Sequence, residues 1–416
     1  MFARTTFNRA EQILASVQHG RPTHLRGVDL QMRKTSVAVA VLGITAVTVL
    51  SACASSSKKT TSSSPAPAGS TPATSAAGSS SPAAGGAIDG KGAKVGIILP
   101  DTTSSPRWIT ADPTALKADC VKYNLSCDIQ NADGSPAKMK TIAQQMEGNK
   151  VKVLMIVDLD AASGAAIEQQ AKKAGVLTVD YDRLTPAGGA ALYVSFDNVK
   201  VGQVQGTALT QCPQVKGQKS VQYVDIDGAP TDNNATLFAQ GYDGVLSKTP
   251  GWTRLAKQTG NWDAPTAGRV FNSMLGAHPN IKAVMVANDT MAGAVITDLT
   301  RSGLNGKVAV SGQDASAAGL QQIMDGNQCF TIYKPSKLEA DPAMKAIAQL
   351  VNGQAPDTGG VTIEDPQTHT KVPALLATPI AITKANVAQP INDLYTPKNT
   401  VCTGAFVAKC KAAGVK

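Results

Sequence analysis

Short apolar runs alternate with segments of helical spacing over most of the chain. The first runs, KVGIILP at 94–100 and VKVLMIV at 151–157, are apolar throughout, as strands buried on both faces are. Between them Met139, Ile142 and Met146 recur at helical spacing, which predicts a helix over 135–149. Strands that alternate with helices of about a dozen residues predict right-handed βαβ units and a parallel sheet.

The same alternation occurs in two consecutive sets, which predicts an α/β chain of two lobes, each with its own doubly wound parallel sheet. The tail from 361 to 416 contains the apolar run 372–382 and no other element that the pattern defines. Strands are predicted at 94–100, 127–130, 151–157, 176–180, 191–195, 220–225, 253–257, 281–287, 308–311 and 329–333, and helices at 113–123, 135–149, 161–174, 199–210, 235–248, 265–275, 290–302, 317–325 and 341–351.

The N-terminal region 1–53 has the features of an export signal. Met32-Arg33-Lys34 precedes an apolar stretch of about 15 residues, which is short for a membrane span. The sequence Leu-Ser-Ala then leads into Cys53, as in a bacterial lipobox, where the cysteine thiol receives a diacylglyceryl group. This predicts an exported protein, lipid-anchored on the outer face of the cell membrane. A plain signal peptide with an incidental cysteine is the alternative, and Met32 is a possible true start.

Residues 54–91 consist almost entirely of Ser, Ala, Thr, Pro and Gly. Such a composition cannot bury enough apolar surface to offset the entropy lost on ordering. We therefore expect a disordered tether between the anchored cysteine and a globular body.

The formal net charge of +9 is a weak argument for nucleic-acid binding, because much of it lies outside the predicted body. Residues 1–90 contain eight Lys or Arg and three Asp or Glu, which leaves 31 basic and 27 acidic residues for the remainder. That remainder has no dense basic helix and no strip of interleaved basic and aromatic residues. The sequence therefore predicts no nucleic-acid partner.

Polar clusters follow the predicted strands at their carboxyl ends, where doubly wound sheets bind ligands. A single cluster of this kind is more often a helix N-cap than a ligand contact. Five clusters in successive loops favour a binding site, although some of their members can still be caps. The clusters are Arg107-Trp108, Asp182-Arg183, Asp232-Asn233-Asn234, Asn288-Asp289 and Gln313-Asp314.

These side chains suit a sugar. A carboxylate or guanidinium group can bridge two neighbouring hydroxyls, and an indole face, as in Trp108 or Trp262, suits the C–H side of a sugar ring. Carboxylates among arginines argue against an anionic ligand such as phosphate.

Enzymatic chemistry has less support in the sequence. His278 and His369 are the only histidines after the signal region, too few for a metal cluster or a Cys–His dyad, and no G-x-S-x-G motif occurs. We expect no catalytic residue, no metal and no cofactor. A glycosidase-like carboxylate pair, with Asp289 or Asp314 as the acid, remains an alternative.

Six cysteines lie beyond Cys53, an even number that can form three disulfides in an exported protein. Fifteen pairings are possible. Cys120–Cys127 and Cys402–Cys410 are the simplest expectations because they are close in sequence, and they would leave Cys212 with Cys329. Free buried thiols are the alternative.

From about residue 94 to residue 394 the chain resembles the type I periplasmic sugar-binding proteins of ABC importers, above all those that bind D-xylose. The stretches that carry the resemblance are YDRLT at 181–185, YVSFDNVKVG at 193–202, PTDNNATLF at 230–238, ANDTMAGA at 287–294, SGQDA at 311–315 and IYKP at 332–335.

The resemblance implies two lobes that close on a sugar about three crossovers, near residues 197, 333 and 360. The N-terminal lobe would comprise 92–197 and 334–358, and the C-terminal lobe 198–332 and 359–416. The cysteines depart from the family pattern. The family's sugar contacts correspond to Arg107, Trp108, Asp182, Arg183, Asp232, Asn234, Trp262, Asn288, Asp314 and Lys334.

The function that follows is a monomeric, lipid-anchored binding protein that captures D-xylose or a related aldose and delivers it to the permease of an ABC importer. A sugar-sensing protein that presents its ligand to a receptor is the alternative, and a carbohydrate-modifying enzyme is a weaker one. A sugar-responsive repressor would need an N-terminal helix-turn-helix, where this chain has an export signal.

Overall fold

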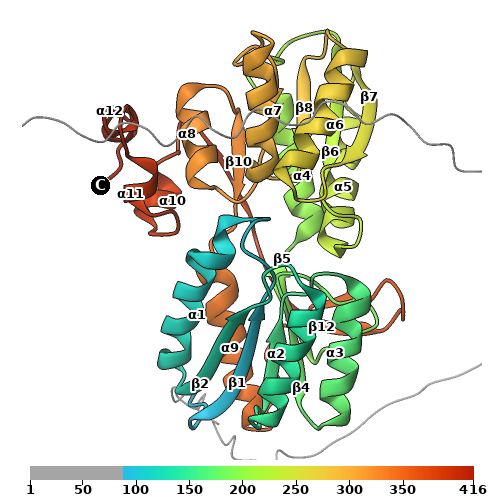
Figure 1. Ribbon diagram of the computed structural model, residues 1–416, viewed down its shortest axis with the longest axis vertical. Helices are drawn as coiled ribbons and strands as arrows, with labels where there is room; N and C mark the ends of the chain where they lie inside the picture. Colours follow the sequence, from blue (N-terminus) through green and yellow to red (C-terminus); the bar gives the residue numbers. More distant parts are fainter. Residues whose placement is uncertain (1–87) are drawn as a thin grey trace, which may run out of the picture. The chain divides into compact units, whose positions relative to one another are not determined.

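Residues 88–416 are described by the computed structural model, and they are built around two mainly parallel sheets covered by helices (Figure 1). The predicted export signal, Cys53 and the tether up to residue 87 lie outside the described residues. Among the helices of residues 88–416, none is both long and apolar enough to cross a membrane.

The first sheet has seven strands in the order β11-β12-β5-β4-β3-β1-β2. All neighbours are parallel except β11 and β12, which form an antiparallel edge pair. The strands are β1 (Ala93–Leu99), β2 (Leu125–Asn131), β3 (Val153–Ile156), β4 (Leu177–Tyr181), β5 (Leu192–Phe196), β11 (Thr362–Glu364) and β12 (Lys371–Ala377).

Helices cover both faces of this sheet, which together with them forms the first lobe. Leu116 of α1 and Ile347 of α9 pack with Val95 and Ile97 on one face, whereas Met139 of α2 and others pack on the opposite face. The apolar strand β1 is therefore buried from both sides, as its sequence predicts. The helices are the 3-10 helix η1 (Pro106–Ile109), α1 (Ala111–Lys122), α2 (Pro136–Gly148), α3 (Ala161–Lys173) and α9 (Lys337–Val351).

The second sheet has the order β7-β6-β8-β9, with all neighbours parallel. A single bridge between Gln313 and Ile332 continues it to β10, which pairs antiparallel with β13. The strands are β6 (Val221–Asp227), β7 (Trp252–Thr259), β8 (Ala283–Val286), β9 (Ala309–Val310), β10 (Phe330–Tyr333) and β13 (Ile380–Thr383).

This sheet and its helices form the second lobe. Helices α6 and α7 cover one face and α4 and α5 the other, in two separate apolar clusters. Helices α4 and α5 touch through glycines, since a Cβ on Gly202 would lie 2.0 Å from the Phe238 carbonyl oxygen. The helices are α4 (Asn198–Thr210), α5 (Asn233–Leu246), α6 (Ala264–Ala277), α7 (Asp289–Arg301) and α8 (Ala317–Asp325).

The chain passes between the sheets three times, and one expected boundary is wrong. The first two passages run from β5 into α4 and from β10 into α9. The third lies between β12 and β13 and not near residue 360, because β12 pairs with β5 in the first sheet. Residues 362–377 thus belong to the first lobe. The apolar run 372–382 is two strands separated at Thr378-Pro379, where proline cannot continue a ladder.

The C-terminal segment 384–416 packs against the second lobe, although its sequence showed no clear pattern. Ile391, Tyr395 and Val401 lie in one buried cluster with Leu320 and Ile323 of α8. The segment contains three short helices, α10 (Gln389–Asn392), α11 (Lys398–Val401) and α12 (Phe406–Ala412).

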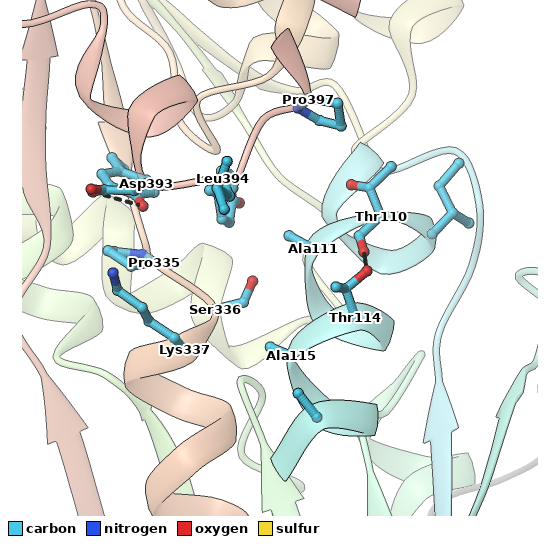
Figure 2. Close-up of a pocket in the computed structure, with 14 residues that line it drawn as sticks. Thr110, Ala111, Thr114, Ala115, Pro335, Ser336, Lys337, Asp393, Leu394 and Pro397 are labelled. Atoms are coloured by element: carbon cyan, nitrogen blue, oxygen red, sulfur yellow. Dashed lines mark hydrogen bonds between the residues drawn. The ribbon is translucent and has the colours of Figure 1, made fainter. Parts of the chain in front are cut away.

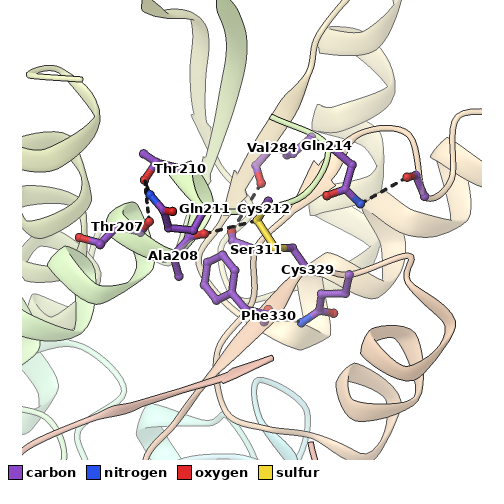
Figure 3. The surroundings of a disulfide bond; sticks show 12 residues. Thr207, Ala208, Thr210, Gln211, Cys212, Gln214, Val284, Ser311, Cys329 and Phe330 are labelled. Atoms are coloured by element: carbon purple, nitrogen blue, oxygen red, sulfur yellow. Dashed lines mark hydrogen bonds between the residues drawn. A yellow bond between two sulfur atoms is a disulfide. The ribbon is translucent and has the colours of Figure 1, made fainter. Parts of the chain in front are cut away.

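Three disulfides link the six cysteines in the simplest of the expected pairings. Cys120–Cys127 joins α1 to β2, and Cys402–Cys410 closes a loop of the C-terminal segment. Cys212–Cys329 joins the region after α4 to the residue before β10 (Figure 3). This last bridge spans 117 residues and so restricts the unfolded chain most strongly.

Candidate ligand-binding site

A small cavity of about 30 Å³ lies where the polar loops of the two lobes meet. Larger hollows of about 390 and 690 Å³ contain none of the ten predicted site residues; the smaller of the two lies between α1 and the segment 393–397 (Figure 2). The cavity is lined by Ser104, Ser105, Trp108, Asp182, Arg183, Asp232, Asn234, Phe238, Trp262, Asn288, Gln313, Asp314 and Lys334.

Every predicted site residue except Arg107 lines this cavity. The prediction did not include Ser104, Ser105, Phe238 and Gln313 as contacts. Gln313 belongs to a polar cluster that the sequence did single out, and the two serines directly precede η1, which contains Arg107. Phe238 lies on α5, where nothing in the sequence distinguishes it from an ordinary core residue.

Arg107 lies behind the cavity wall, at the centre of a buried ion cluster. Its Nε and Nη2 donate to the two carboxylate oxygens of Asp112 at 2.8 and 2.7 Å, and Nη1 donates to Asp182 Oδ2 at 2.7 Å. Nη2 also pairs with Glu339, and all four side chains are buried. The guanidinium group therefore orients Asp182 and is itself fully engaged by protein carboxylates.

Asp182 follows β4 with a φ of 63°, in the left-handed region that non-glycine residues seldom adopt. Its carbonyl oxygen accepts hydrogen bonds from Ser195 Oγ at 2.7 Å and Asn234 Nδ2 at 2.9 Å. Burial opposes ionisation of the carboxyl, but Lys334, Arg107 and Arg183 outweigh it and lower the pKa of Asp182. Asp182 is therefore an ionised acceptor of hydrogen bonds.

Arg183 extends from the first lobe to the second. Its Nη1 donates to the Asp158 carbonyl at 2.8 Å, and its Nε lies 3.0 Å from Asp232 Oδ2. Burial disfavours the charge, yet Asp232 and Asp158 outweigh that effect and raise the pKa of Arg183. The cation is thus a permanent donor between the lobes.

The second lobe contributes residues that also cap helices. Asp232 accepts from the Asn234 amide at 2.9 Å as the N-cap of α5, and Asn288 accepts from the Met291 amide at 3.0 Å as the N-cap of α7. Asp232 also accepts from Trp262 Nε1 at 3.0 Å, and Asn288 Nδ2 donates to the Ser104 carbonyl at 2.9 Å. Asp232 and Asn288 therefore have both roles: each caps a helix and each lines the cavity.

Aromatic rings form the apolar part of the wall. Trp262 lies against Gly228, where an added Cβ would come within 2.0 Å of the indole, and meets Phe238 edge to face at 6.4 Å. Lys334 Nζ lies 5.5 Å from the Phe238 ring and 3.3 Å from Asp182 Oδ2. The Arg107 guanidinium lies 4.4 Å from the centre of the Trp108 ring, and this cation–π contact helps to hold the ring in place.

Some polar atoms of the wall are buried without a hydrogen-bond partner in the described part of the chain. They are Ser105 Oγ, Trp108 Nε1 and Gln313 Oε1. Unpaired buried groups of this kind are unfavourable unless something binds them. They are two donors and an acceptor that a polar ligand can use.

The charges along the wall nearly cancel. Asp182, Asp232 and Asp314 face Arg183 and Lys334, and Arg107 lies behind them. Within residues 88–416, no group of three or more His, Cys, Asp or Glu side chains is placed to hold a metal ion. An uncharged ligand with many hydroxyls fits such a wall better than an anion, a cation or a metal.

This fold and site define a two-lobed solute-binding protein. The periplasmic binding protein domain family matches residues 95–355, and the chain belongs to that family, with the type I fold. It is 32% identical over 312 residues to a D-xylose-binding periplasmic protein of Escherichia coli (strain K12), covering 73% of this chain and 91% of that one.

Two further relatives show the breadth of the family. A multiple sugar-binding periplasmic receptor of Rhizobium radiobacter is 27% identical over 315 residues, covering 70% of this chain and 87% of its own. The crystal structure of a carbohydrate transporter solute binding protein from Chloroflexus aurantiacus, in complex with D-glucose, superposes with a TM-score of 0.65 at 28% identity. It covers 74% of this chain and 97% of that one.

Proposed function

We propose that this protein binds a neutral monosaccharide between its lobes, most specifically D-xylose or a related aldose, and delivers it to an ABC importer. The observation that carries the proposal is the charge-balanced, two-sided wall of the cavity. The relatives are named for binding D-xylose or multiple sugars, or are bound to D-glucose, which supports the same ligand class.

In this proposal the cavity residues are the sugar contacts. Asp182, Arg183, Asp232, Asn288 and Asp314 would hold hydroxyls. Asn234 and Lys334 would join them, and Trp108 and Trp262 would contact the ring faces. Arg107 would act on the sugar only through Asp182.

Binding requires the two lobes to separate and close again. The cavity volume of about 30 Å³ is room for one or two water molecules, and not for a sugar ring. Direct contacts between the lobes, Arg183 with Asp232 and Asn234 with Asp182, join residues that line the cavity. Sugar hydroxyls would replace these contacts one for one, so little hydrogen bonding is lost on binding.

The lipid anchor at Cys53 and the tether would keep the binding lobes near the permease on the outer face of the membrane. Delivery needs no catalytic group, and we propose that the bound sugar is released unchanged. The protein would act as a monomer, because one chain supplies both faces of the site.

Calorimetric titration of the purified protein with D-xylose, D-glucose, D-ribose, L-arabinose, D-galactose and myo-inositol tests this function. We expect at least one member of the panel to bind with a Kd in the micromolar range or below, about −8 kcal/mol. No heat of binding across the panel would contradict the sugar assignment. NMR of the same mixtures should show unaltered sugar; formation of a product would favour the enzyme alternative.

A further inference from the structure

The loop that presents Asp314 has an unfavourable backbone conformation. Asp314 has a φ of 93° and Ala315 a φ of 46°, so two consecutive non-glycine residues lie at positive φ. Side chains with a Cβ seldom adopt this conformation, which persists only where surrounding contacts enforce it. The direction of the Asp314 carboxylate therefore depends on what holds this loop.

Three hydrogen bonds hold the backbone of Asp314 and Ala315, and one of them comes from a distant part of the chain. The Asp314 amide donates to the Ile332 carbonyl at 2.7 Å, and the Ala315 amide donates to Thr331 Oγ1 at 3.0 Å, both on the adjacent strand β10. The third bond is donated by Thr396 Oγ1 to the Ala315 carbonyl at 2.7 Å. Thr396 lies in the C-terminal segment and is 5% exposed. The flanking residues are held by Asp289, which accepts from the Ser316 amide at 2.8 Å and donates its own amide to the Gln313 carbonyl at 3.0 Å.

The C-terminal segment is itself fixed on the second lobe, so Thr396 has a defined place. Gln321 Nε2 of α8 donates to the Val401 carbonyl at 2.8 Å, and the Cys402–Cys410 disulfide follows directly. Helix α8 begins just after the Asp314 loop, with Ser316 as its N-cap. The C-terminal segment is thus hydrogen-bonded to both the Asp314 loop and helix α8.

We infer that Thr396 is a positioning residue for sugar binding, which fixes the peptide after Asp314 and so directs the Asp314 carboxylate into the cavity. This inference rests on the proposed function. It makes the disulfide-closed C-terminal segment part of the binding apparatus, although none of its residues lines the cavity.

Calorimetric titration of Thr396→Val tests the inference, with the sugar that the wild-type protein binds. Valine keeps the shape and removes the donor, and we expect the Kd to rise about five- to tenfold. Thr396→Ser, which restores a hydroxyl, should return the Kd to within about twofold of the wild-type value. Thr400→Val is the matched control, because the exposed Thr400 donates only to the nearby Pro397 carbonyl.

Combining Thr396→Val with Asp314→Asn separates positioning from general stability. If Thr396 acts through Asp314, Thr396→Val should change the Kd by less than about twofold in the Asp314→Asn background. An equal loss in both backgrounds, or an unchanged Kd in Thr396→Val alone, would overturn the inference. If Thr396→Val does not fold, Thr331→Val can be used instead, because it removes the hydrogen bond that Thr331 Oγ1 accepts from the Ala315 amide. Its effect on the Kd must then also be lost in the Asp314→Asn background.

The two proposals fail in different ways. Absence of binding by the wild-type protein counts against the proposed function. Normal wild-type binding with no coupling between Thr396 and Asp314 counts against the positioning role alone.

Discussion

The two lobes make their halves of the site by different physical means. The first lobe presents Asp182 and Arg183 from a buried ion network, in which Arg107 is shared by three carboxylates. The second lobe presents Asp232 and Asn288 as helix N-caps, held by the backbone amides that follow them. One half depends on long-range charge pairs, and the other on the local geometry of loop and helix.

This difference determines how each half should respond to substitution. A residue within an ion network cannot be removed without leaving its partners charged and buried, so the fold should suffer first. A cap can be removed at the cost of one local hydrogen bond, so binding and stability should change by comparable, smaller amounts.

Arg107→Met should give the largest effect, a loss of about 3–5 kcal/mol in the free energy of unfolding measured in urea. The substitution leaves Asp112, Asp182 and Glu339 buried without their shared cation. Lys138→Met is the control, since Lys138 makes an exposed ion pair with Asp133 and its loss should cost less than about 1 kcal/mol. Similar losses for the two variants would mean that the network is not what supports the first lobe.

Asp314→Ala should cost at least about 2 kcal/mol of sugar-binding free energy in a calorimetric titration, because it removes a buried charged acceptor. Asp128→Ala, on the edge strand β2 of the first lobe, should leave the Kd unchanged, since the exposed Asp128 does not line the cavity. An unaltered Kd for Asp314→Ala would show that the aspartate only shapes its loop.

Trp262→Leu should weaken sugar binding by about 1–2 kcal/mol, through loss of the ring face and of the indole donor to Asp232. Trp252→Leu is the control: Trp252 packs against Tyr223 outside the cavity. That variant should lose stability with no change in Kd. If both tryptophan variants bind alike, stacking on Trp262 has no part in recognition.

Asn288→Ala should give the smallest effect on the fold, about 1 kcal/mol in the free energy of unfolding, as expected for a lost N-cap. Asp160→Ala, which removes the cap of α3, should lose a similar amount. Only Asn288→Ala should also raise the Kd for sugar. If Asn288→Ala and Asp160→Ala have the same Kd for sugar, Asn288 is only a structural cap.

The same contrast explains what the sequence could predict. The polar clusters of the second lobe are visible in the sequence because each lies between a predicted strand and a predicted helix, and Asp232, Asn288 and Asp314 do line the cavity. Arg107 was expected to touch the ligand, because nothing local reveals that Asp112, Asp182 and Glu339 surround it.

Pairing between strands that are far apart in sequence also explains why part of the fold was predicted incorrectly. The strand β12 was assigned to the second lobe because the family resemblance placed the third crossover near residue 360, whereas its pairing with β5, in which Ala374 lies opposite Tyr193, is not visible in the local sequence. Phe238 was overlooked because a buried aromatic residue on a helix has the same sequence pattern in a core and in a binding site.

A crystal structure of the wild-type protein with its best-binding sugar would show whether both lobes hold the ligand. We expect one sugar ring beside Trp262, with Asp182 or Arg183 of the first lobe and Asp232, Asn288 or Asp314 of the second within hydrogen-bonding distance of its hydroxyls. A sugar held by one lobe alone, or bound in the hollow between α1 and residues 393–397, would contradict this expectation.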